Sequence, residues 1–226
     1  MQTNMQSSKK NTLQNKAQFI VVEGLEGSGK SSAIALVQHW LQQKGHDVIC
    51  TREPGGTPMA EQIRNLVKQV SDEVVSPTTE LLLMYAARMQ LMTNVITPAL
   101  TAGKTVLADR HDMSSRAYQG GGRQLDEAFI NDLRRAVLSE HTPDITLYLD
   151  IDPKIGLQRA LERGKLDRIE LEQLAFFERT REKYQQIAAN ESNVFTIDAS
   201  QAIEQVHADI ISVLNAQVAP HTQATL

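Results

Sequence analysis

The stretch GLEGSGKS at residues 24–31 decides the fold class, because two glycines five positions apart are followed directly by Lys and Ser. The run before it, FIVV at 19–22, is short, apolar and β-branched, as a buried parallel strand requires. Residues 32–43 after it repeat apolar side chains at helical spacing. A glycine loop in this position points backbone N–H groups and a helix dipole at one spot, which favours a polyphosphate. The sequence therefore predicts a nucleotide-binding phosphate loop.

The loop assigns roles to individual side chains. Lys30 is expected to reach the β- and γ-phosphates of the nucleotide, and the hydroxyl of Ser31 to help hold Mg²⁺. The residues expected to bind the phosphates of ATP are Gly24, Gly27, Ser28, Gly29, Lys30, Ser31 and Ser32.

Composition limits the class of protein and its partners. The chain has 226 residues, 41% of them hydrophobic, so it can bury one sizeable core. Its net charge of −4 gives no general attraction to nucleic acid. A single cysteine, Cys50, suits a reducing compartment and lies in an apolar run, which predicts a buried thiol. No apolar run is long enough to span a bilayer, so we expect a cytoplasmic protein without membrane or nucleic-acid partners.

Strand and helix patterns alternate along the chain, which predicts an α/β protein with a parallel sheet covered on both faces. We expect a disordered extension at 1–17, a single domain at 18–216 and a tail at 217–226. Further strands are expected at 47–51, 105–108, 145–151 and 194–197. Helices are expected at 59–70, 77–100 with a possible bend at Pro98, 126–138, from Pro153, 170–190 and 202–216, with a loop over 109–123.

Charged side chains gather where phosphates are expected. Phosphoryl transfer needs cations and positioned donors around the phosphate oxygens rather than covalent help. Arg52 and Arg110 follow two of the predicted strands and are interpreted as a fixed clamp. Asp109, at the tip of the same strand as Arg110, is a candidate for holding or orienting Mg²⁺.

A second basic group surrounds Gly164 and is interpreted as a mobile lid over about 159–169 that covers the transferring phosphate and excludes water. The alternative for each of these side chains is a solvated charged helix face. The lid residues are Arg159, Arg163, Lys165 and Arg168.

Six segments in a fixed order resemble bacterial thymidylate kinases over about residues 19–212. The resemblance implies a three-layer P-loop NTPase fold with a five-stranded parallel sheet, a single nucleoside monophosphate kinase domain and a homodimer. It also implies transfer of the γ-phosphoryl of ATP to dTMP, giving dTDP and ADP, with Mg²⁺ as cofactor, in dTTP synthesis. The segments are FIVVEGLEG (19–27), TREPGGT (51–57), YAAR (85–88), DRH (109–111), AYQGGGR (117–123) and LDRIE (166–170).

The resemblance assigns the sugar and phosphate of dTMP to particular residues. Glu26 would accept a hydrogen bond from the 3′-hydroxyl, and Arg52 and Arg110 would grip the 5′-phosphate. Tyr118 would crowd the 2′ side of the sugar and favour deoxyribose.

For the base, the resemblance implies that Arg88 bonds the carbonyl edge of thymine, with Ser115 against the base and Gln119 in the same pocket. Met84 stands where the family often has a phenylalanine that stacks on thymine. A thioether can cover an aromatic face. Tyr85 could instead take over this role, or Met84 could simply fill the core.

The catalytic arginine is expected among the lid residues. Gly27 comes directly after Glu26, so no arginine projects from the loop, as in the bacterial subgroup with a lid-borne catalytic arginine. Arg163 is the best candidate for that role, with Arg159 and Arg168 behind it. A phosphate monoester is already ionised at neutral pH, since its second pKa is about 6, so no general base is required. The expected catalytic residues are Lys30, Asp109, Arg110 and Arg163.

Two other functions remain open at this point. A kinase for another nucleoside monophosphate, or for a nucleoside, is the first; a nucleoside acceptor would need a base such as Glu23 or Asp109. A GTP-binding switch is the second, but it predicts an Asn-Lys-x-Asp segment, which the sequence lacks. Residues 198–200 could form a wall for adenine or a simple turn.

Overall fold

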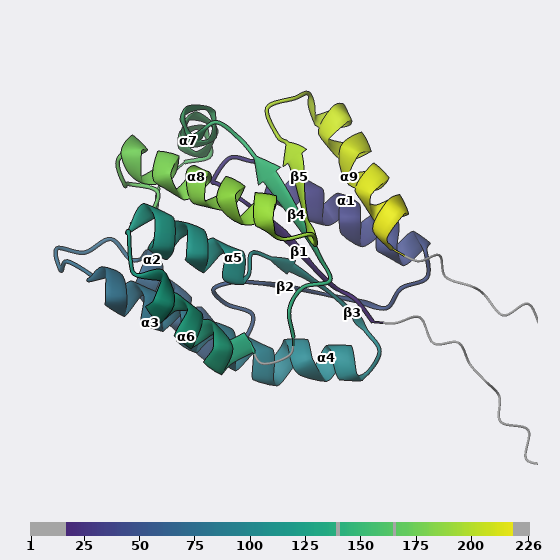
Figure 1. Ribbon diagram of the computed structural model, residues 1–226, viewed down its shortest axis with the longest axis horizontal. Helices are drawn as coiled ribbons and strands as arrows, with labels where there is room; N and C mark the ends of the chain where they lie inside the picture. The colour runs from purple at the N-terminus through teal and green to yellow at the C-terminus, as the bar shows by residue number, and fades with distance from the viewer. Residues whose placement is uncertain (1–16, 139–140, 165, 219–226) are drawn as a thin grey trace, which may run out of the picture.

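The computed structural model describes residues 17–138, 141–164 and 166–218. Five strands form one parallel sheet in the order β2-β3-β1-β4-β5, with helices on both faces (Figure 1). This confirms the predicted fold class. The strands are β1 (Phe19–Gly24), β2 (Val48–Arg52), β3 (Thr105–Asp109), β4 (Ile145–Asp150) and β5 (Val194–Asp198).

Helices cover the sheet because side chains alternate along the buried strands. Ile20 and Val22 of β1 pack in one cluster with Val37 of α1, whereas Phe19 and Val21 pack in another with side chains of α3 and α4. α1 and α9 lie side by side (Figure 1). The helical elements are α1 (Lys30–Gln43), α2 (Pro58–Lys68), α3 (Pro77–Leu91), η1 (Met92–Ile96), α4 (Thr97–Thr101), α5 (Asp112–Ser115), η2 (Arg116–Gly122), α6 (Glu127–Leu138), α7 (Pro153–Glu162), α8 (Leu174–Asn190) and α9 (Ile203–Gln217).

The register of the sheet brings the predicted strand tips together. Val22 pairs with Asp109, and Arg52 pairs with the same residue from the other side. The carboxyl ends of β1, β2 and β3 therefore lie next to one another, at the edge where open α/β sheets bind their ligands. The phosphate loop leaves this edge and packs on α7. A Cβ atom at Gly156 would lie 2.5 Å from the carbonyl oxygen of Glu26, so only glycine allows this approach.

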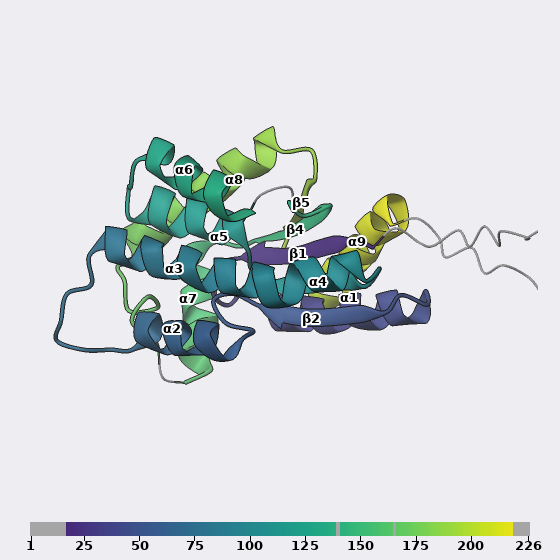
Figure 2. The same cartoon turned by 90° about the horizontal axis from the view of Figure 1, so that it is seen from below.

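The helix predicted over 77–100 is interrupted rather than simply bent at Pro98. α3 ends at Leu91, a π-helical segment η1 follows, and α4 begins at Thr97. Proline cannot donate the helical hydrogen bond, and its ring crowds the carbonyl four residues earlier, so the wider π turn relieves the clash. Figure 2 shows α3 and α4 following each other in nearly one direction.

The loop predicted over 109–123 is wrong, because most of it is helical. α5 and η2 occupy residues 112–122. Of the three glycines at 120–122, two serve close packing against α8. A Cβ atom at Gly121 would lie 2.6 Å from Cβ of Lys183, and one at Gly122 would lie 2.5 Å from the ring of Phe176.

The helix predicted over 170–190 begins later, at Leu174. The side chain of Asp167 accepts hydrogen bonds from the backbone N–H groups of Ile169 and Glu170, at 2.9 and 3.0 Å. These bonds favour a turn over a helix start at Glu170, as short acidic side chains often do.

Cys50 is exposed, so the predicted buried thiol is wrong. The apolar run around it forms β2, which is an edge strand of the sheet and is only partly covered. An apolar run alone does not distinguish an edge strand from a central one.

The predicted termini lie mostly outside the described residues, which begin at 17 and end at 218. α9 continues through Gln217, and Val218 is buried. In the described part of the chain, no helix combines the length and apolar character needed to cross a bilayer.

Candidate active site

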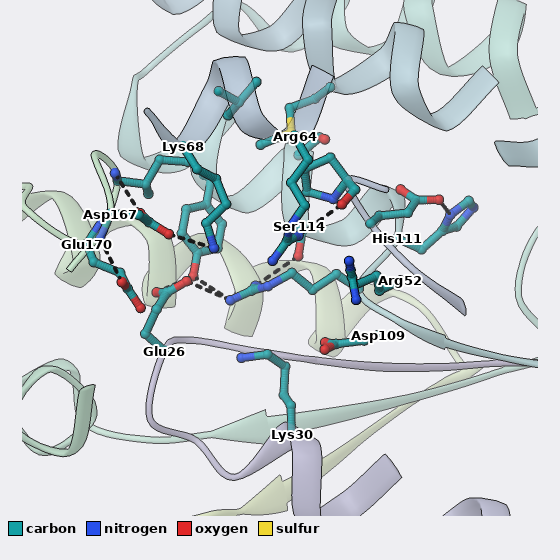
Figure 3. A pocket seen from close by; sticks show the side chains of 18 of the residues that line it. Glu26, Lys30, Arg52, Arg64, Lys68, Asp109, His111, Ser114, Asp167 and Glu170 are labelled. Carbon is teal, nitrogen blue, oxygen red and sulfur yellow. Dashed lines mark hydrogen bonds and ion pairs between the residues drawn. The ribbon is translucent and has the colours of Figure 1, made fainter. Parts of the chain in front are cut away.

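A cavity of about 550 Å³ opens at the carboxyl ends of β1, β2 and β3. Figure 3 shows Lys30, Asp109 and Arg52 on one side of it, and Lys68, Asp167 and Glu170 on another. The residues predicted for the acceptor and for catalysis all line this one cavity: Glu26, Lys30, Arg52, Met84, Arg88, Asp109, Arg110, Ser115, Tyr118, Gln119 and Arg163.

Lys30 begins α1 and lies at the floor of the cavity. Its ammonium donates hydrogen bonds to the carbonyl oxygens of Gly24 and Leu25, at 3.0 and 2.7 Å. Gly29, at φ +89°, holds the left-handed turn that leads into the helix. Burial, together with the nearby charge of Arg110, lowers the pKa of Lys30 to about 8. The charged form of Lys30 is therefore destabilised in the free protein, and a nearby anion such as a phosphate would stabilise it strongly.

Arg110 follows β3 and spans the cavity to the phosphate loop. Its Nη2 donates to Oε1 of Glu26 at 2.7 Å, and the hydroxyl of Tyr118 donates to the other carboxylate oxygen at 2.6 Å. Arg110 has a φ of +68°, a conformation that costs energy outside glycine and is common at functional sites. Burial would raise the pKa of Glu26, but the charges of Arg110 and Lys30 hold it below its usual value. Glu26 is thus an ionised acceptor inside a phosphate-binding loop.

Glu23, near the end of β1, is a fully buried carboxylate that the sequence marked only as a possible base for a nucleoside acceptor. It accepts hydrogen bonds from the backbone N–H of His111 at 2.8 Å, from the hydroxyl of Ser114 at 2.6 Å and from Tyr184 at 3.0 Å. Burial raises the pKa of Glu23. With its lone pairs occupied by the protein, Glu23 supports the turn after β3 rather than facing a substrate.

Arg88 lies on α3 and is 2% exposed. Its Nε donates to Glu53 at 2.7 Å, and Nδ1 of His111 lies 2.7 Å from the other oxygen of the same carboxylate. Nη2 donates to Ser115 and to a backbone carbonyl, both at 3.0 Å. Nη1 is 4.0 Å from Asp112 and has no hydrogen-bond partner in the described residues. The guanidinium is therefore fixed in place, and its Nη1 is left without a hydrogen bond from the described residues.

Arg52 is held differently, on the surface. Its Nη2 lies 3.0 and 2.9 Å from the two carboxylate oxygens of Glu61, and its side chain is 53% exposed. Exposed ion pairs are worth only about 0–1 kcal/mol, so a phosphate can replace Glu61 at little cost.

Apolar side chains form part of the cavity lining. Met84 packs with Val67 and Ile169, and all three line the cavity. Tyr85 points elsewhere: it is buried, and its hydroxyl donates to Asp112 at 2.7 Å. Of the two candidates for covering a base, only Met84 lines the cavity.

The predicted lid residues separate in the structure. Arg159 donates to the carbonyl oxygens of Gly27 and Ala199, at 3.4 and 3.3 Å, and Arg163 is exposed beside Glu170 at 3.1 Å. Arg168 does not line the cavity. Its Nε donates to the carbonyl of Val67 at 2.9 Å and its Nη2 to Glu80 at 2.7 Å. Lys165 lies outside the described residues.

Two cavity-lining cations on α2 were missed by the sequence analysis. Arg64 donates to the carbonyl of Pro54 at 2.9 Å, and Lys68 pairs with Asp167 at 2.8 Å. Their spacing could have revealed them, since the two residues are four apart and therefore share one face of the predicted helix. Nothing in the sequence placed that face toward the cavity.

A second cavity of about 210 Å³ adjoins the phosphate loop. Ser28, Gly29 and Ser32 line it, together with residues of α9 and with Ala199 from the loop after β5. Arg159 lines both cavities and so lies between them.

A magnesium ion fits the oxygen donors at the phosphate loop. Ser31 and Asp109 both line the main cavity, and Oδ1 of Asp109 is buried without a hydrogen-bond partner in the described residues. The described residues contain no cluster of three or more His, Cys, Asp or Glu that could hold a metal alone. Mg²⁺ is usually held by a few protein oxygens together with the phosphates of the substrate.

A phosphate loop on a parallel sheet, facing a cavity lined by arginines, defines a P-loop phosphotransferase. A family model described as thymidylate kinase matches residues 22–210. The chain is 57% identical over 196 residues to a thymidylate kinase of Idiomarina loihiensis, covering 87% of this chain and 96% of that protein. It is 58% identical over 199 residues to that of Pseudoalteromonas translucida, covering 88% and 96%. The chain therefore belongs to the thymidylate kinase family, which confirms the resemblance and the predicted ATP-dependent phosphorylation of dTMP to dTDP.

Nucleotide binding should depend on pH through Lys30. Phosphates restore the stabilisation that burial removes, so bound ATP raises the pKa of Lys30 above its free value of about 8. The complex then holds more protons than the free enzyme. Affinity is therefore greatest below pH 8 and falls as the pH rises above it, by at most about tenfold per unit.

Calorimetry of ATP binding at pH 8.5 in buffers of different ionisation enthalpy should detect proton uptake. Lys30→Arg is the matched control, because an arginine stays charged throughout this range and should bind ATP without taking up a proton. Equal heats in all buffers for the wild-type enzyme would contradict the assignment.

Proposed function

We propose that residues 18–216 form a single kinase domain in which dTMP lies in the main cavity with its phosphate toward Lys30. The supporting observation is the arrangement of that cavity. The phosphate loop and Arg110 line it, and so do the buried guanidinium of Arg88 and apolar side chains of α2 and α3. This combination of cationic, polar and apolar lining suits a nucleotide, which presents a phosphate, a sugar and a base.

The proposed contacts extend from the phosphate of dTMP through its sugar to its base. Arg110, already fixed by Glu26, and Arg52, released from Glu61, hold the 5′-phosphate. Glu26 accepts from the 3′-hydroxyl, and Tyr118 lies beside it, against the sugar. At the base, Arg88 donates from Nη1, Met84 covers the ring face, and Ser115 and Gln119 complete the pocket.

We infer that ATP approaches from the other side of the phosphate loop. Its phosphates would contact the glycine loop from Gly24 through Ser32, and its adenine would enter the second cavity beside Ala199. Ser31 and Asp109 would hold Mg²⁺, which supplies charge neutralisation at the transferring phosphoryl group. The acceptor oxygen is already ionised, so the chain's task is to hold two anions together.

We propose that the segment over about 159–169 acts as a lid. Arg163 and Arg159 lie beside the junction of the two cavities, and Arg163 is exposed and weakly held. Arg168 contributes by fastening the segment to α2 and α3 rather than by reaching the phosphates. A cytoplasmic location and a role in dTTP synthesis are consistent with this activity and are part of the proposal.

The acceptor is tested by comparing turnover of dTMP, dUMP, dCMP and thymidine with ATP and Mg²⁺. We expect dTMP to be used best and thymidine not at all, because a nucleoside lacks the phosphate that the arginines hold and would also need a general base for its hydroxyl proton. Turnover of thymidine at a rate similar to that of dTMP would contradict the proposal.

Arg163→Ala should lower kcat by about a hundredfold while dTMP affinity changes little, because the guanidinium acts on charge that develops during transfer. Steady-state kinetics and equilibrium binding of dTMP separate the two quantities. Arg135→Ala removes another exposed, ion-paired arginine, on α6, and serves as the control. An unchanged kcat in the Arg163 variant removes this residue from the catalytic set.

We also propose a homodimer through the helices that flank the cavity. Leu82 and Met89 are 47% and 46% exposed and are seven residues apart, so they share one face of α3. Met59 and Leu66 on α2 repeat this spacing. Sedimentation of Leu82→Glu/Met89→Glu should give a monomer where the wild type gives twice that mass. A dimer in both samples would place the interface elsewhere.

A further inference from the structure

Glu80 is a buried carboxylate that no part of the proposed site uses. It lies in the first turn of α3 and has an exposure of 0%. Three side chains from two segments of the chain converge on it. It accepts hydrogen bonds from Gln119 Nε2 at 2.8 Å, from Arg123 Nη2 at 3.0 Å and from Arg168 Nη2 at 2.7 Å.

These donors keep Glu80 ionised. Burial would raise the pKa of Glu80, but hydrogen bonds from Arg123 and Gln119 hold it below the usual value for a glutamate. An ionised carboxylate accepts hydrogen bonds and donates none. The amide of Gln119 must therefore turn its NH₂ group toward Glu80.

This fixes what Gln119 presents on its other side. Gln119 lines the main cavity, and its Oε1 is buried without a hydrogen-bond partner in the described part of the chain. Arg88 lines the same cavity with Nη1 as an unused donor. Nη1 of Arg88 and Oε1 of Gln119 are thus one donor and one acceptor that the described residues leave unpaired, and each side chain is fixed by a carboxylate behind it.

The pair matches one class of pyrimidine. Thymine and uracil carry an acceptor at O4 next to a donor at N3–H, which complement Arg88 and Gln119. Cytosine carries the opposite pair, a donor at N4 and an acceptor at N3. A cytosine in this pocket would bring donor against donor and acceptor against acceptor, leaving buried polar groups unpaired.

We propose that Glu80 is a positioning residue that holds Gln119 as a hydrogen-bond acceptor and thereby makes the enzyme reject cytosine nucleotides. The inference rests on the dTMP site proposed above. Glu80 does not line the cavity, so it acts through Gln119. Without the charge of Glu80, the amide can turn over and offer Nε2 to N3 of cytosine.

The test is the ratio of kcat/KM for dTMP to kcat/KM for dCMP in Glu80→Gln. We expect this ratio to fall by about tenfold or more, partly through a gain in turnover of dCMP. A purely structural role would reduce active enzyme and change both substrates equally, which leaves the ratio unmoved. An unchanged ratio in E80Q overturns the proposal.

Two controls separate Glu80 from its neighbours. Glu172→Gln removes another carboxylate that pairs with Arg123, at 2.5 Å, but leaves the Gln119 contact intact, so the ratio should stay at the wild-type value. Arg168→Met loosens the segment above the base and should affect both substrates alike. A fall in the ratio in either control to the level of E80Q would also overturn the proposal.

The dependence on Gln119 is tested by a double-mutant cycle. Gln119→Leu should lower the ratio by itself, and adding E80Q should lower it no further. If E80Q does not fold, Glu80→Asp replaces it, since the shorter side chain withdraws its carboxylate from Gln119 and leaves the amide free to turn; the same fall is expected. Failure of the wild type to use dTMP would refute the proposed function, whereas an unmoved ratio in an active enzyme refutes only the role of Glu80.

Discussion

Charge balance inside the cavity is the constraint on which the rest of the site depends. A pocket that gathers two phosphorylated molecules needs several cations, yet buried cations without partners are expensive and repel one another. The chain answers this by setting two of the cavity arginines against carboxylates: Arg110 on Glu26, and Arg88 on Glu53. The guanidinium groups are thereby held in place before any ligand arrives, which is the preorganisation that electrostatic catalysis requires.

Burial decides which of these pairs persist when ligands bind. The Arg88–Glu53 pair is 3% and 4% exposed, and breaking such a pair costs about 3–5 kcal/mol, so it stays intact and keeps the guanidinium of Arg88 in place. The Arg163 side chain is 61% exposed beside Glu170, where a pair is worth about 0–1 kcal/mol. A phosphate can take over such an arginine. Arginine is therefore a fixed part of the scaffold in one place and an exposed, weakly held side chain in another.

The sequence was informative where local pattern determines position. Each parallel strand was predicted to within a few residues, and the strand tips carried Arg52, Asp109 and Arg110 to one edge, where the structure has them. Prediction failed where the outcome depends on distant partners. Arg168 resembles a lid cation in sequence, but its direction is set by Glu80, which lies 88 residues earlier. The π-helical turn over 116–122 likewise depends on packing against α8, which no local pattern reveals.

Selectivity in this site is encoded partly in side chains that never meet the substrate. An amide such as Gln119 is a donor at one end and an acceptor at the other, so its identity alone does not say which edge of a base it reads. The carboxylate behind it supplies the missing information, because Glu80 accepts only N–H. The same logic applies to Arg88, whose Nε is committed to Glu53, which leaves Nη1 for the ligand. The same cavity-lining residues with different hydrogen-bond partners behind them would present a different arrangement of donors and acceptors. The preference for one base therefore depends both on the residues that line the cavity and on the residues that hold them.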